Sequence, residues 1–244
     1  MTTVAIVAFP LANETIFARQ FTANLTMANL YFGYQPIESV YWSLAIELGF
    51  YGMMAAVFAL NQLRRIEVLG TIWVLISAFV FKIFPAIGAV IPWRLQAATA
   101  LPWAPLFFAG ILLYRMRVQG ANTTRLILLA GCLAVLISRY TMGYALGSIG
   151  VFAVFTFACA GWLPFLKWKP LTILGAISYP LYLVHQSIGM RIQDAVVTRL
   201  GANAYWGLAG ALICVVSLAA AVSYGVERRT QRWLRERFAR NWRA

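Results

Sequence analysis

The chain has 244 residues, of which 62% are hydrophobic and only 11% are charged, and its formal net charge is +13. Soluble domains carry about 25% charged residues, so this composition excludes an ordinary cytosolic globule, a disordered tail and a secreted disulfide scaffold. A nucleic-acid-binding domain needs its basic residues on a water-facing surface, and so little charge leaves little such surface. The composition predicts an integral membrane protein with no nucleic-acid partner.

Seven apolar stretches approach the length of about 20 residues that a membrane-spanning helix needs. In chain order they lie at residues 42–60, 68–84, 97–114, 126–138, 144–163, 171–190 and 205–226, and residues 2–12 form an eighth, shortened stretch. The stretch at 126–138 needs Thr123 and Thr124 as its start. The connection at residues 13–40 is rich in Asn, Thr and aromatic residues, which favours the membrane interface. Because the apolar runs are continuous rather than alternating, barrel strands are not expected.

These stretches predict an all-α, polytopic bundle of about seven to eight transmembrane helices that forms a single domain over residues 1–244. Alternating the helices across the membrane puts fourteen Lys and Arg on the side of the C-terminus and five on the other. Cytoplasmic loops carry the excess of basic residues, so we expect a cytoplasmic C-terminus. The arginine-rich tail also holds Trp233, Leu234, Phe238 and Trp242, which favours a helix lying on anionic lipid headgroups over one that binds a protein or nucleic acid.

Three ionisable side chains, Glu47, Lys82 and His185, fall within the predicted spans. Such groups cost at least a few kcal/mol in a bilayer and are functional candidates by default. A helical rise of about 1.5 Å per residue places all three in the outer half of the membrane. Each also has a structural interpretation: Lys82 reaches the interface, Glu47 pairs with a buried Arg or Trp, and His185 packs with one hydrogen bond. One histidine beside one carboxylate does not make a metal site, so no metal is expected.

Four segments of the chain resemble the motifs of one known protein family. The segment from Trp42 to Tyr51 is similar to the family signature W-S-L-x-x-E-x-x-F-Y, and the segment from Leu174 to His185 is similar to G-x-I-S-Y-x-L-Y-L-x-H. Residues 106–115 resemble an F-x-x-G-x-x-x-Y helix, and residues 223–229 resemble the S-x-x-x-x-E-R/K-P ending, with Arg229 in place of Pro. Together these motifs resemble those of the membrane acyltransferase family 3 proteins, and the resemblance covers essentially all 244 residues in the family's order.

The resemblance implies a multi-pass enzyme of the bacterial cytoplasmic (inner) membrane that moves an acyl group, commonly acetyl from acetyl-CoA, onto a hydroxyl of a cell-surface carbohydrate or lipid-linked glycan. On this reading Glu47 and His185 are the catalytic candidates. Aromatic faces suit sugar rings, so the acceptor site is expected among the motif residues Trp42, Ser43, Tyr51, Tyr179 and Tyr182. Packing and interface anchoring are the alternatives for the aromatic residues.

Acyl-CoA is the expected donor, and its phosphates arrive from the cytoplasm. Arg64, Arg65, Arg115 and Arg117, with Arg125 nearby, lie on that side and suit phosphate binding. The alternative is that these arginines act only as topology signals.

Family members begin with further helices, the first carrying an Arg and a His regarded as central to catalysis, followed by F-F-x-x-S-G-F. None of these is found here, so we expect an N-terminally incomplete domain with an incomplete catalytic set. A non-catalytic or proton-coupled transporter, or a structural subunit, is the alternative function. The sequence specifies no oligomeric state.

Overall fold

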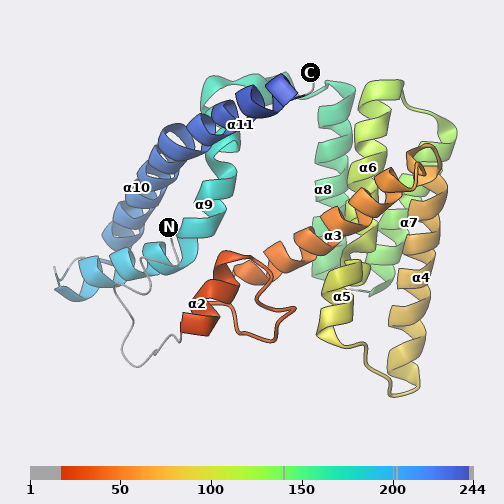
Figure 1. Cartoon of the computed structure of the whole chain (residues 1–244), viewed down its shortest axis with the longest axis horizontal. Coiled ribbons are helices and arrows are strands. Elements are labelled where there is room, and N and C mark those ends of the chain that lie inside the picture. Colours follow the sequence, from red (N-terminus) through yellow and green to blue (C-terminus); the bar gives the residue numbers. More distant parts are fainter. Residues whose placement is uncertain (1–17, 140, 200, 202, 242–244) are drawn as a thin grey trace. The chain divides into compact units, whose positions relative to one another are not determined.

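The computed structural model describes residues 18–139, 141–199, 201 and 203–241, and every regular element among them is helical. The long helices, labelled in Figure 1, are α2 (Ala18–Leu25), α3 (Tyr41–Ala59), α4 (Ile66–Ala86), α5 (Trp93–Thr99), α6 (Ala104–Gln119), α7 (Thr123–Arg139), α8 (Met142–Ala160), α9 (Lys169–Asp194), α10 (Ala204–Val222) and α11 (Arg228–Asn241). The short elements are η1 (Leu63–Arg65), η2 (Leu101–Trp103), η3 (Pro164–Lys167) and two π-helical turns, η4 (Ala195–Arg199) and η5 (Ser223–Glu227). The span predicted at residues 2–12 and the tail residue Trp242 lie outside the described residues.

The all-helical fold is confirmed for the described residues, and each of the seven apolar stretches within them is helical over most of its length. Four helices are long and apolar enough to cross a membrane: Tyr41–Ala59, Leu63–Ala86, Met142–Ala160 and the run Ala204–Arg237. A fifth is added if α5 and the η2–α6 segment are counted as one span. Helix α7 begins at Thr123, as predicted, but has only 17 residues.

The stretch expected as one helix at 97–114 is broken. Trp93–Thr99 and Leu101–Gln119 meet at an angle of 50°, and Ala100 between them takes the left-handed conformation with φ +44. Pro102 favours a break here, because it cannot donate a backbone N–H to the Ala98 carbonyl and its ring hinders continuation of an α-helix across this point. The prediction of a continuous helix missed this effect.

The chain divides into two compact units, each described here by itself. The terminal unit combines Met1–Trp42 with Lys167–Ala244, and the central unit is Ser43–Leu166. Among the described residues, the terminal unit contains α2, α9, α10 and α11, and the central unit contains α4 to α8 together with nearly all of α3.

In the central unit, α4, α6, α7 and α8 lie side by side around one apolar core (Figure 1). Phe108 of α6 lies at its centre, 1% exposed, with Leu112, Leu129 and Cys132 around it. The ring reaches this position because α4 carries Gly70 where the helices meet. The core therefore depends on a large aromatic residue, Phe108, that packs directly against a glycine, Gly70.

In the terminal unit, α9 packs along α10 (Figure 1). Ile177 and Val184 of α9 interlock with Val215 and Ala219 of α10, and all four are buried. This contact holds the motif-bearing helix α9 and leaves its other face for the segment that connects α2 to α3.

Candidate functional site

The first motif forms the start of α3. Ser43, Glu47 and Tyr51 are spaced four residues apart and so lie on one face of this helix. Glu47 is half-buried, and among the described residues it forms no hydrogen bond or ion pair. One position earlier than Tyr51, Phe50 stacks on Phe107 of α6 with ring centroids 4.3 Å apart. The motif thus combines an aromatic anchor in the central unit with a carboxylate that has no partner there.

The second motif lies on α9, in the terminal unit. The Tyr182 hydroxyl donates to the Val40 carbonyl at 3.1 Å, and the Tyr179 hydroxyl lies 4.0 Å from the Met27 sulfur. Both tyrosines therefore bind the segment that follows α2. The structure brings together the predicted residues Tyr179, Tyr182 and His185 on α9, whereas Glu47 belongs to the other compact unit.

His185 is exposed, and its contact shows which ring nitrogen donates. Its Nδ1 lies 2.7 Å from the Tyr182 carbonyl oxygen. A carbonyl only accepts hydrogen bonds, so Nδ1 carries a proton and donates it to this contact. This contact fixes the orientation of the ring on α9.

Pro180 interrupts the hydrogen bonding of α9 in the middle of the second motif. It cannot donate to the carbonyl of Ala176, four residues earlier. The Ser223 hydroxyl, from the π-helical turn η5, donates to that same carbonyl at 3.4 Å. Neighbouring serine side chains commonly replace hydrogen bonds that proline removes in membrane helices. The second and fourth motifs, 47 residues apart along the chain, are therefore joined by one contact.

Glu38 is the residue of this region that the sequence analysis missed. Its side chain is 1% exposed, and its Oε2 accepts a hydrogen bond of 2.5 Å from the Ser187 hydroxyl of α9. Burial raises the pKa of the Glu38 carboxyl, while the Ser187 hydrogen bond and the charges of Arg191 and His185 act in the opposite direction. Glu38 is the first charged residue after an uncharged stretch from Gln20 to Ile37, which is its signal in the sequence. It was missed because it lies outside the predicted spans, within which the ionisable candidates were chosen.

The arginines that the sequence analysis expects on the cytoplasmic side fall into two groups. Arg125 is nearly buried and donates to Glu67 at 2.8 Å, to the Gln119 side chain at 2.6 Å and to the Gly120 carbonyl at 2.7 Å. Arg115 also faces Glu67, at 3.3 Å. These contacts join the start of α4, the end of α6 and the start of α7.

The other group, Arg64, Arg65 and Arg117, is exposed, and its side chains form no hydrogen bond or ion pair with the residues that the structure describes. Arg64 and Arg65 immediately precede α4, and Arg117 is in the last turn of α6. Because Glu67 joins the ends of those two helices, all three exposed guanidinium groups belong to the same end of the central unit.

The break between α5 and α6 is stabilised by donors from neighbouring helices. Trp73 Nε1 donates to the Thr99 carbonyl at 3.0 Å, and the Ser77 hydroxyl donates to the Leu101 carbonyl. Arg139 donates to the Ser77 hydroxyl at 2.9 Å and to the Pro102 carbonyl at 3.3 Å. Each of these three carbonyls at the break therefore accepts a side-chain hydrogen bond from a neighbouring helix.

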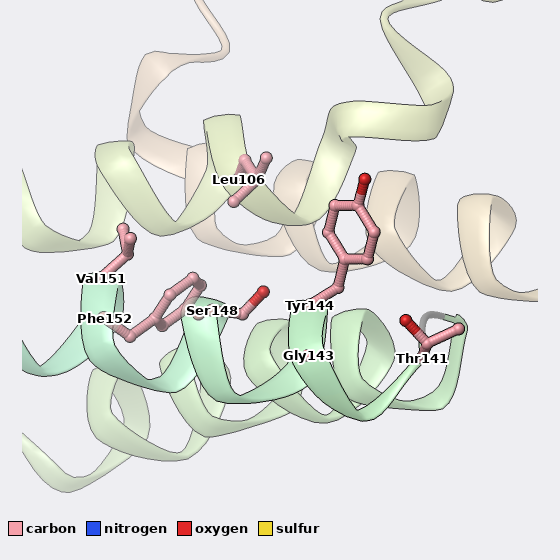
Figure 2. Close-up of a pocket in the computed structure, with 8 residues that line it drawn as sticks. Leu106, Thr141, Gly143, Tyr144, Ser148, Val151 and Phe152 are labelled. Atoms are coloured by element: carbon pink, nitrogen blue, oxygen red, sulfur yellow. The ribbon is translucent and has the colours of Figure 1, made fainter.

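A groove of about 580 Å³ lies between α6 and α8 in the central unit. Leu106 belongs to α6, and the other labelled side chains come from α8 or the residue before it (Figure 2). Its polar groups are hydroxyls, on Thr141, Tyr144 and Ser148, and no charged residue lines it. The groove thus suits an apolar chain better than phosphates. No group of three or more metal-ligating side chains occurs within the described ranges.

The comparison with known proteins identifies the family. The family model for an acyltransferase domain, that of acyltransferase family 3, matches residues 1–226. No curated protein and no solved structure matches the chain. The family match includes the first motif on α3, the second on α9 and the first four residues of the fourth at η5, Ser223 to Val226. The chain therefore belongs to acyltransferase family 3 and is a membrane acyltransferase.

Proposed function

We propose that this membrane acyltransferase moves an acyl group, acetyl in the first instance, from acyl-CoA to a hydroxyl of a cell-surface carbohydrate or lipid-linked glycan. The observation that carries the proposal is the family match over residues 1–226. The reaction needs a base for the acceptor hydroxyl, a group that stabilises the developing oxyanion, and cations for the phosphates of the donor. Glu47 and His185 are the proposed catalytic residues from the two principal motifs.

The exposed arginines support an anionic donor. Arg64, Arg65 and Arg117 present unpaired guanidinium groups at one end of the central unit, whereas Arg115 and Arg125 are occupied with Glu67. Guanidinium groups bind phosphates with charge-assisted hydrogen bonds. The proposed CoA contacts are therefore Arg64, Arg65 and Arg117, with Arg115 in a supporting position through Glu67.

The proposed topology follows the charge asymmetry of the sequence. On this proposal all seven apolar stretches cross the bacterial inner membrane, including α7 and α9, and the C-terminus with α11 lies in the cytoplasm. Helix α9, with 26 residues, is long enough to cross. The end of the central unit that carries Arg64, Arg65 and Arg117 then faces the cytoplasmic pool of CoA.

The experiment supplies radiolabelled acetyl-CoA to membranes that contain the protein and measures alkali-labile label in the polysaccharide and lipid-linked glycan fractions. An ester releases its acyl group in alkali, so labile label reports O-acylation. Glu47→Gln is expected to lower labelling at least 100-fold, the lower range of general acid–base effects, with unchanged membrane insertion. Asp194→Asn, which removes an exposed carboxylate on α9, is the matched control and is expected to label like the wild type. Equal labelling by Glu47→Gln contradicts the role of Glu47, and no ester in the wild type favours the transport or structural alternative.

A further inference from the structure

Four side-chain polar atoms of the terminal unit are buried without a hydrogen-bond partner among the described residues: Oδ1 of Asn29, Oε2 of Glu227, and the oppositely charged pair Oε1 of Glu38 and Nε of Arg191. Buried polar atoms are almost always hydrogen-bonded, and an exception commonly marks a bound water, an ion or a catalytic group. Within this pair, the guanidinium of Arg191 acts electrostatically on the Glu38 carboxylate. No direct ion pair joins them within the part of the chain that the structure describes.

Several contacts fix the Glu38 side chain in place. Ser187 holds Oε2 at 2.5 Å, and Tyr182 binds the carbonyl of Val40, two residues after Glu38. On the other side, the buried Asn24 of α2 accepts from the backbone N–H of Ile37 at 2.9 Å and donates to the Gln35 carbonyl at 3.1 Å. Glu38 is therefore held between α2 and α9, with one carboxylate oxygen engaged and the other free.

Arg191 lies on the same face of α9 as Ser187, because the two are four residues apart. The Ser187 hydroxyl and the Arg191 guanidinium thus approach Glu38 from one helix. Arg191 only donates hydrogen bonds, and an ionised carboxylate only accepts them. One group that donates to Oε1 and accepts from Nε would satisfy both unpartnered atoms at once.

A hydroxyl group meets this requirement. A phosphate or carboxylate ligand would be repelled by Glu38, and an ammonium ligand would be repelled by Arg191. Tyr179 and Tyr182, both exposed, present aromatic rings on the preceding turns of α9, and aromatic faces suit sugar rings. The surroundings therefore fit a hydroxyl of a carbohydrate.

We propose that Glu38 Oε1 and Arg191 Nε bind the acceptor hydroxyl, and that Glu38 is the general base that takes its proton. This inference rests on the proposed acyl transfer and names the group that activates the acceptor. The hydroxyl oxygen forms a bond to the acyl carbonyl carbon while its proton passes to Oε1. The C–S bond of the thioester breaks, the thiolate leaves with the electron pair, and the proton on Glu38 returns to the thiolate through solvent.

The charge environment of Glu38 suits this role. Burial raises the pKa of its carboxyl toward the working range of a base, and the acting charges, Arg191 and His185, both come from α9 and keep the ionised form accessible. Asn24, on the α2 side, contributes a neutral amide. Activity should therefore fall as the pH falls through the pKa of Glu38.

The experiment measures acetyl-CoA-dependent ester formation with the purified full-length protein in lipid nanodiscs, using the glycan fraction that the wild type labels, across pH 4–9. Glu38→Gln is expected to lower kcat at least 100-fold, the lower range for a general base, with the KM for acetyl-CoA unchanged within twofold. Glu38→Asp should recover part of the activity. Ser187→Ala should remain active with the acidic limb of its pH–rate profile moved to higher pH, because losing the Ser187 hydrogen bond raises the Glu38 pKa. Asp194→Asn is the control and should keep the wild-type profile.

The outcomes separate the two proposals. If the wild type forms no ester with acetyl-CoA, the proposed function is wrong and this inference falls with it. If the wild type is active and Glu38→Gln retains more than a third of the wild-type kcat, the proposed function stands and the inference is overturned. A structural water between Glu38 and Arg191 then accounts for the two buried atoms. If Glu38→Gln fails to fold, Ser187→Ala decides: a wild-type pH–rate profile overturns the inference, and a displaced acidic limb supports it.

Discussion

The packing of Phe108 against Gly70 yields a quantitative prediction for Gly70→Ala. A Cβ at Gly70 would lie 2.1 Å from Cδ2 and from Cε2 of the Phe108 ring, and 2.8 Å from Cζ. Carbon atoms in contact are normally about 3.5–4.0 Å apart, so the ring must rotate or α4 and α6 must separate. Phe108 is 1% exposed and surrounded by core residues, which leaves the ring little space to move.

The magnitude follows from two opposing effects. Overpacking a core costs about 1–3 kcal/mol, and an overlap of this depth puts Gly70→Ala at the upper end. Replacing a helical glycine by alanine gains about 1 kcal/mol of helix propensity. The net loss of unfolding free energy is therefore about 2 kcal/mol, which lowers the Tm of a chain of this size by about 4–8 °C.

The assay is thermal unfolding of the purified protein in detergent. Gly131→Ala in α7 is the matched control, because a Cβ there meets nothing within 4 Å, and it is expected to raise the Tm slightly. Phe108→Leu should cost less in the Gly70→Ala background than alone, since the smaller side chain relieves the overlap. A Gly70→Ala protein as stable as the wild type, with additive double-variant energies, would refute the predicted contact.

Three further predictions concern the contact between two motifs and the two groups of arginines. Ser223→Ala should lower the unfolding free energy by about 0.5–1 kcal/mol. This loss should be smaller in a Pro180→Ala background, because alanine restores a backbone N–H that donates to the Ala176 carbonyl. An equal loss in both backgrounds would show that Ser223 does not replace the missing hydrogen bond. Arg125→Gln should destabilise the protein by about 3 kcal/mol, because it leaves the half-buried Glu67 without its shorter ion pair. Arg64→Gln with Arg65→Gln should leave the Tm unchanged and raise the KM for acetyl-CoA about tenfold, equal to a loss of about 1.4 kcal/mol of binding free energy. Thermal unfolding and initial-rate kinetics on the same preparations distinguish the two groups, and the reverse pattern would contradict the division of the arginines.

Much of the helical architecture could be predicted, because it depends on local sequence. Continuous apolar runs predict helices wherever they occur, and α7 begins at the threonine that the short stretch needs. The break at Ala100 was also encoded locally, by Pro102, although the prediction of a continuous helix passed over it. The motif residues were recognisable for the same reason, since Glu47 and His185 are isolated ionisable groups in apolar helices.

The sequence by itself therefore determined the membrane class, the helices, the family and the residues that stand out by polarity. The tertiary structure decided which polar groups meet. The contacts of Glu38 with Ser187, of Ser223 with the Ala176 carbonyl and of Arg125 with Glu67 join residues 149, 47 and 58 positions apart. Periodicity and composition describe one helix at a time, whereas these pairings depend on how helices pack. Burial converts an unremarkable loop glutamate into a carboxylate with one free oxygen, and it separates the arginines that stabilise the fold from those left exposed.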